Sequence, residues 1–88
     1  MANLDSIIEY PLEFPIKVMG LNHPDFAAEI TALVQQHALD FDPASLTMRP
    51  SSGGKYLSLT VTINARNREQ LDDLYRALSG HPMVKITL

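Results

Sequence analysis

The chain contains no cysteine, and none of its purely apolar runs exceeds a few residues. Without cysteine it can form neither disulfide bonds nor thiolate metal sites. The apolar runs are too short for a transmembrane helix, which needs roughly 20 apolar residues. Residues 1–10 include Asp5 and Glu9 and have no basic start, so they do not resemble a secretory signal peptide. These absences favour a cytoplasmic protein that does not enter a membrane.

Positive charge is also scarce. The 88 residues carry 7 Lys and Arg against 10 Asp and Glu, which gives a net charge of −3. This acidic balance argues against nonspecific binding to nucleic acid. The length is enough for one domain only. We therefore expect an N-terminal leader over residues 1–10 and a single domain over residues 11–88.

Alternation of apolar and polar residues predicts four strands, over residues 14–19, 46–49, 56–64 and 84–88. Two apolar stripes at helical spacing predict helices over 26–38 and 67–78. The second helix begins with a capping-box pattern, in which Asn67 is the cap and Gln70 follows three residues later.

The order of these elements is strand, helix, strand, strand, helix, strand. With right-handed crossovers, this order predicts an α+β ferredoxin-like split βαβ sandwich. We expect a four-stranded antiparallel sheet of order 4-1-3-2, with both helices on one face. The clean alternation in the third strand indicates that the opposite face is uncovered.

The side chains that could act in catalysis or bind a metal do not form a recognisable catalytic motif. His23, His37 and His81 do not have the spacing of metal ligands. The run 51–54 reads as a hairpin turn, since it lacks the spacing and the lysine of a phosphate-binding loop. The sequence therefore predicts a protein that is not an enzyme, with no catalytic residue, no metal and no cofactor.

The uncovered sheet face is more informative. Parity along the strands assigns to it Lys17, Met19, Thr47, Arg49, Tyr56, Ser58, Thr60, Thr62, Asn64, Lys85 and Thr87. This face is rich in hydroxyls and mildly basic although the chain is acidic. One reading is a solvated face, because threonine suits exposed strand positions. The other is a contact surface for a protein partner or a second copy, with Lys17, Arg49, Tyr56 and Lys85 as the binding residues. RNA binding is disfavoured, because Tyr56 is the only aromatic residue there.

Four segments in order resemble the YbeD-like bacterial proteins, a family of unknown function, some members of which are called lipoate regulatory proteins. The segments are 14–20, with the sequence FPIKVMG, 49–56, with RPSSGGKY, 69–75, with EQLDDLY, and Val84-Lys85. The resemblance implies a ferredoxin-like fold similar to the ACT domains, which bind amino acids beside metabolic enzymes. It implies no enzymatic activity.

The junction between the first strand and the first helix is similar to the ACT ligand turn. The matching residues are Gly20, Asn22, Pro24 and Asp25. In ACT domains such a turn and the following helix N-terminus receive a small ligand, and free N–H groups there would suit a carboxylate. Asn22 stands where an acid is usual and Asp25 where glycine is usual, and Asp25 would repel a carboxylate. An ordinary strand-to-helix turn is the other reading.

Two functions follow as hypotheses. The first is a regulatory or adaptor domain that acts through protein contacts or self-association on the uncovered sheet face. The second is a sensor that binds a small carboxylate metabolite at the turn over residues 20–25.

Overall fold

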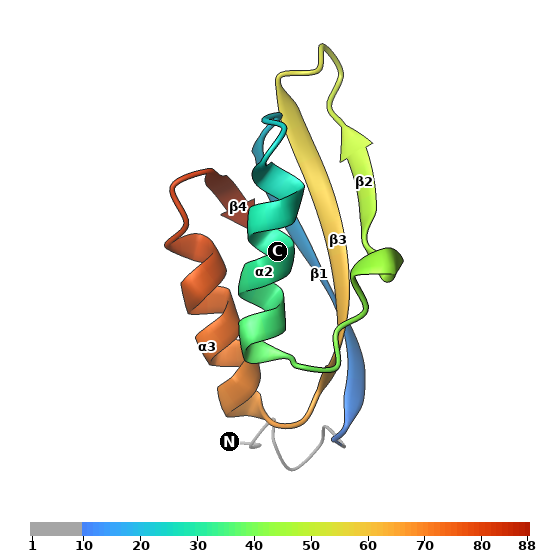
Figure 1. Ribbon diagram of the computed structural model, residues 1–88. Coiled ribbons are helices and arrows are strands. Elements are labelled where there is room, and N and C mark those ends of the chain that lie inside the picture. Colours follow the sequence, from blue (N-terminus) through green and yellow to red (C-terminus); the bar gives the residue numbers. More distant parts are fainter. Residues whose placement is uncertain (1–9) are drawn as a thin grey trace.

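The computed structural model describes residues 10–88, so the predicted leader lies outside the described residues except for Tyr10. The described part contains all of the predicted strands and helices (Figure 1). Their bounds are β1 Leu12–Leu21, α2 Phe26–His37, the 3₁₀ turn η1 Pro43–Ser45, β2 Thr47–Pro50, β3 Tyr56–Ala65, α3 Arg68–Ser79 and β4 Val84–Thr87. Neither α2 nor α3 is long and apolar enough to cross a membrane.

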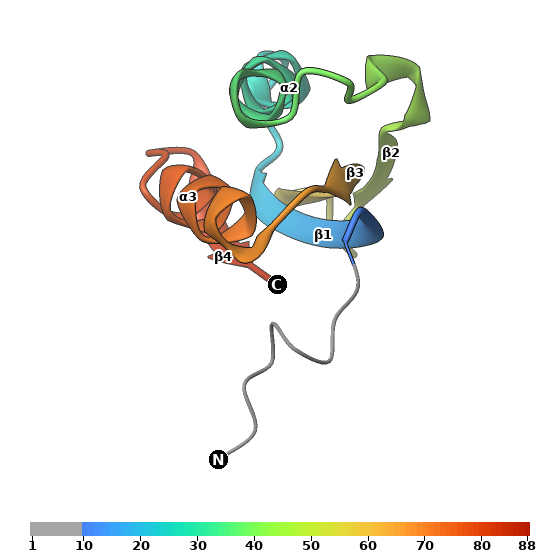
Figure 2. The ribbon, with the colours of Figure 1, turned by 90° about the horizontal axis from the view of Figure 1, so that it is seen from below.

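The strands form one sheet of order β2-β3-β1-β4, in which every neighbouring pair is antiparallel. This is the predicted order 4-1-3-2 counted from the other edge. Both helices pack on one face of the sheet, and the opposite face has no layer of described residues over it (Figure 2). The two long strands, β1 and β3, are central and pair along their whole length.

The core lies between the sheet and the helices because the apolar residues of both point there. Alternate residues of β1 and β3 meet the apolar stripes of α2 and α3. The fully buried large side chains are Ile16, Val18, Phe26, Ile30, Val34, Leu59, Val61, Ile63, Leu74 and Leu78.

The capping box of α3 is present with a small variation. The Asn67 side chain accepts a hydrogen bond from the Gln70 amide at 2.8 Å. The Gln70 side-chain oxygen reaches back one residue further than usual, to the Arg66 amide at 2.7 Å. The Gln70 side-chain amide also donates to the His37 carbonyl at 2.8 Å. The start of α3 is thereby tied to the end of α2.

The prediction that Thr87 of β4 lies on the open sheet face is wrong. The register shifts between Met19 and Gly20, so that Ile86 pairs with Met19 and Thr87 pairs with the buried Val18. Thr87 therefore faces the helices, while Ile86 faces outward. This bulge makes Lys85 an extra residue in the ladder. The alternation of residues 84–88 predicts Val84, Ile86 and Leu88 on one inner face, so the sequence pattern pointed to the unshifted register.

Candidate binding surface on the open sheet face

Two rows of side chains cross the open sheet face from β2 to β4. The register sets Thr47 beside Thr60, Thr60 beside Lys17, Arg49 beside Ser58 and Ser58 beside Met19. The rows end on the β4 side, where Leu88 exchanges two backbone hydrogen bonds with Lys17 and Ile86 pairs with Met19. The face is thus polar over β2 and β3, whereas towards β4 it is apolar except for Lys17 on β1.

The apolar half is a continuous stripe that the sequence pattern did not reveal. It consists of Met19, Leu21, Ile86 and Leu88, which are 36%, 39%, 50% and 70% exposed. Leu21 lies opposite Tyr56, which extends the stripe towards β3. Only two other large apolar residues in the described part of the chain are exposed, so most of this exposure is gathered on one face. Contiguous exposed apolar surface is typical of contact sites, whereas isolated apolar residues are not.

Two predicted cations border the stripe. Lys17 and Arg49 occupy neighbouring rows on β1 and β2, with the hydroxyls of Ser58 and Thr60 on β3 between them. Within residues 10–88 neither cation forms an ion pair with a carboxylate. Lys85 is exposed, but as the bulge residue on the edge strand it belongs to neither row.

Acidic side chains are nearly absent from the open sheet face in the described part of the chain. Glu13, which pairs with Asn64 at the far end of β1, is the one carboxylate on the strands. On α3 two of the three acids already have basic neighbours: Asp72 lies 3.7 Å from Arg68, and Asp73 lies 3.3 Å from Arg76. The open sheet face therefore carries positive charge that has no partner among the described residues.

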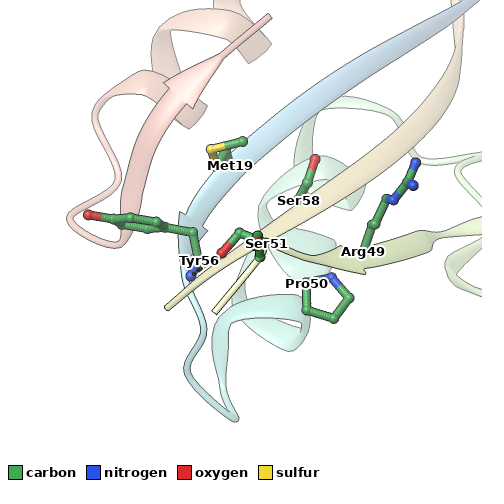
Figure 3. Close-up of a pocket in the computed structure, with 7 residues that line it drawn as sticks. Met19, Arg49, Pro50, Ser51, Tyr56 and Ser58 are labelled. Carbon is green, nitrogen blue, oxygen red and sulfur yellow. Dashed lines mark hydrogen bonds between the residues drawn. The ribbon is translucent and has the colours of Figure 1, made fainter. Parts of the chain in front are cut away.

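Two hollows interrupt the face, and they share Met19 and Ser58 as a common wall. The larger, which we call the hairpin hollow, encloses about 320 Å³. Figure 3 shows Arg49 and Tyr56 at its two sides, with Ser51 and Ser58 between them. Its lining comprises Met19, Arg49, Pro50, Ser51, Ser52, Tyr56 and Ser58. The smaller, of about 160 Å³, is lined by Lys17, Met19, Ser58, Ile86 and Leu88.

The hairpin hollow has a fixed wall because the β2–β3 hairpin is closed by several hydrogen bonds. The Ser51 amide donates to the Tyr56 carbonyl at 2.9 Å, and the Tyr56 amide donates to Ser51 Oγ at 3.0 Å. Gly53 and Gly54 turn the chain with φ of 97° and 73°, which favours glycine. Lys55 Nζ lies 5.6 Å from the centre of the Tyr56 ring, so a second cation stands near the hollow.

The predicted ligand turn is occupied by contacts of the chain itself. The Asn22 side-chain amide donates to the Gly54 carbonyl at 2.8 Å, and the Asn22 backbone amide donates to the Lys55 carbonyl at 3.2 Å. The Asp25 amide donates to His23 Nδ1 at 3.0 Å. Gly20 packs so closely that a Cβ there would overlap the Met83 carbonyl oxygen and lie 2.5 Å from the Phe26 ring.

Pro24 is exposed in this turn, and the turn's residues line neither of the two hollows of the open face. The Asp25 amide in this turn already has His23 as its hydrogen-bond partner. The geometry makes Asn22 an anchor for the β2–β3 hairpin.

A third hollow of about 230 Å³ lies between the start of β1 and α3. Phe14 and Tyr75 meet there edge to face, with ring centres 6.4 Å apart. Burial raises the pKa of the Tyr75 hydroxyl. Residues 10–88 bring together no group of three potential metal ligands, and His81 instead lies 3.2 Å from Glu29.

Comparison with known proteins places the chain in a family. Residues 5–88 match the family described as "Protein of unknown function (DUF493)". The chain belongs to this family. It is 63% identical to a UPF0250 protein of Bordetella pertussis, over 96% of this chain and 92% of that protein. It is 57% identical to a UPF0250 protein of a Janthinobacterium species, over the whole of both chains. The predicted membership of an uncharacterised bacterial family is confirmed.

A solved structure supports the fold. The solution structure of protein HP0495 from H. pylori superposes with a TM-score of 0.76, covering 92% of this chain and 85% of that one. The two sequences are 21% identical, so the likeness concerns the fold alone. Together with the strand order, it fits the predicted ferredoxin-like sandwich.

Proposed function

We propose that this protein is a non-enzymatic regulatory or adaptor domain that binds a partner protein through its open sheet face. The observation that carries the proposal is the apolar stripe, Met19, Leu21, Ile86 and Leu88, bordered by two cations without ion-pair partners in the described chain. Met, Tyr and Arg are enriched at the centres of protein interfaces. Covering the stripe would remove apolar surface from water, which is the main driving force of association.

Charge identifies the kind of partner. Lys17 and Arg49 would attract a surface on which carboxylates surround an apolar patch, since complementary charges steer association and select partners. Two copies docked face to face would bring the same cations together, and like charges there oppose binding. Two of the three acids of α3, Asp72 and Asp73, already lie beside Arg68 and Arg76, so the helical layer of a second copy offers few free carboxylates to Lys17 and Arg49. We therefore propose a different protein as the partner.

The first experiment is affinity capture from a lysate of the source organism, with a charge-reversed variant alongside. Lys17→Glu/Arg49→Glu should lose a stoichiometric partner that the native chain retains. The matched control is Arg66→Glu/Arg76→Glu, which changes net charge equally but alters exposed arginines away from the open face. Circular dichroism should show all three folded, since exposed substitutions usually change stability by about 0.5 kcal/mol or less.

A second variant separates the apolar contribution from the electrostatic one. Ile86→Ser/Leu88→Ser should fold normally, because both residues are at least half exposed, yet also lose the partner. Equal capture by all variants would overturn the assignment to this face. Light scattering on the purified protein tests self-association: a dimer that both open-face variants dissociate would replace the partner protein by a second copy.

A further inference from the structure

The hairpin hollow differs from the rest of the open face by combining one guanidinium with several hydroxyls around an apolar floor. Arg49 stands at one side and Tyr56 at the other, and Met19 lies between their strands and β4 (Figure 3). Ser51, Ser52 and Ser58 supply the hydroxyls. No carboxylate lines the hollow in the described part of the chain. Its chemistry therefore suits a group that carries negative charge on an apolar body.

The polar side of the hollow is already arranged for an anion. Ser51 Oγ accepts the hydrogen bond from the Tyr56 amide, so its own hydrogen remains free to be donated. Arg49 has no ion-pair partner within residues 10–88, and a guanidinium matches a carboxylate with two parallel hydrogen bonds. Asn22 holds the hairpin to the β1–α2 turn, which keeps this wall in position without a ligand.

The size of the hollow limits the ligand. Its volume of about 320 Å³ is at the lower end of the roughly 300–1,000 Å³ typical of small-molecule sites. Arg49 is the one cation among the described residues that line the hollow, and this matches a singly charged, partly apolar molecule better than a polyphosphate, which would need several cations at the site.

We propose that the hairpin hollow binds a small carboxylic acid with an apolar tail. The carboxylate accepts hydrogen bonds from Arg49 and the Ser51 hydroxyl, and the tail packs on Met19 and Tyr56. This assigns a carboxylate site to the β2–β3 hairpin and not to the β1–α2 turn that the sequence suggested. The inference does not depend on a partner protein, although both proposals use Arg49.

The test is an NMR titration of the ¹⁵N-labelled chain with butyrate, hexanoate and 3-phenylpropionate at millimolar concentrations. We expect saturable shifts of the Ser51, Ser52, Tyr56 and Ser58 amides, largest for the two acids with longer apolar parts. The neutral amide 3-phenylpropionamide should bind much more weakly. Arg49→Gln should weaken binding at least about tenfold, since hydrogen bonds to charged groups contribute roughly 1.5–3 kcal/mol. Arg76→Gln, on α3, should leave it unchanged.

Three results would overturn the inference. They are no saturable shift with any of the acids, equal binding of the amide, or binding that Arg49→Gln leaves intact. Shifts confined to residues 22–26 and insensitive to Arg49→Gln would return the ligand to the β1–α2 turn. None of these results bears on partner capture, which Ile86→Ser/Leu88→Ser tests without altering the hairpin hollow. The two proposals can therefore fail separately.

Discussion

The Asn22 side chain donates a hydrogen bond of 2.8 Å to the carbonyl oxygen of Gly54, 32 residues later in the chain. With the backbone bond from Asn22 to Lys55, it joins the β1–α2 turn to the β2–β3 hairpin. The predicted ligand turn and the hairpin, which are far apart in the sequence, are thereby one connected structure. A change in either one should be detectable in the other.

Replacing Asn22 by Ala tests this connection. The bond is solvent-exposed, so we expect a modest loss of unfolding free energy, about 0.5–1 kcal/mol in urea denaturation. Hydrogen exchange should accelerate at the Ser51 and Tyr56 amides, whose hairpin bonds lose their anchor. Asn64→Ala, an exposed asparagine on β3, is the control. Unchanged exchange in the hairpin would show that Asn22 does not hold it.

Gly20→Ala should destabilise the fold by about 1–3 kcal/mol, as overpacking of a core does. The added Cβ meets the Met83 carbonyl and the buried Phe26 ring, and neither can move freely. Phe26→Leu should therefore be less damaging in the Gly20→Ala chain than in the native one. A double-mutant cycle measured by thermal or urea unfolding gives the coupling. Strict additivity would contradict the predicted contact.

Thr87→Val tests the register of β4. The Thr87 hydroxyl is buried and has no hydrogen-bond partner within residues 10–88. Replacing it by a methyl group of similar shape should raise the unfolding free energy by about 1 kcal/mol. Thr47→Val, at an exposed position on β2, should change it little. If β4 ran without its bulge, Thr87 would face solvent and both substitutions would behave alike.

The partly buried Tyr75 side chain predicts a loss of stability at alkaline pH. Burial raises the pKa of its hydroxyl in the folded chain above the ordinary value of about 10. As pH rises through that value, the unfolded chain loses the proton first, so the unfolded state is favoured increasingly. The measurement is the unfolding free energy of the native chain and of Tyr75→Phe, at pH 8 and above roughly pH 10. As pH rises, the native chain should lose stability relative to the variant. A constant difference would contradict the assignment.

The order of elements and the core were predictable because local signals agreed with the fold. In β3 the alternating residues Leu57, Leu59, Val61 and Ile63 fixed the inner face, and the structure confirms it from Leu59 to Ile63. The apolar stripes of α2 and α3 likewise identified their buried sides. Each of these segments can bury only one of its faces against a second layer, so the pattern determines the orientation.

The composition of the open face was only partly predictable. The positions of Lys17, Arg49 and Tyr56 on the open face were predictable from parity, because β1, β2 and β3 pair regularly there. Ile86 and Leu88 were assigned inward because nothing in the pattern of an edge strand marks a bulge. The link between Asn22 and Gly54 depends on two loops meeting in space, which no local spacing expresses. The resemblance to ACT domains indicated a ligand turn over residues 20–25, and the contacts show that Asn22 of this turn also anchors the hairpin.

Because of the bulge at Lys85, an insertion or deletion in β4 changes which of its side chains lie on the open sheet face, which a substitution does not do. In an unbulged ladder continuing from Val84, Lys85 and Thr87 would point outward, and the face would be polar across all of its strands. A homologue that lost Lys85 would keep Ile86 and Leu88 outward with a regular strand. A homologue that instead lost a residue after Lys85 would need a different register of β4 against β1. The side chains that the edge strand β4 exposes on the open face therefore depend on the number of residues in the strand as much as on their identity.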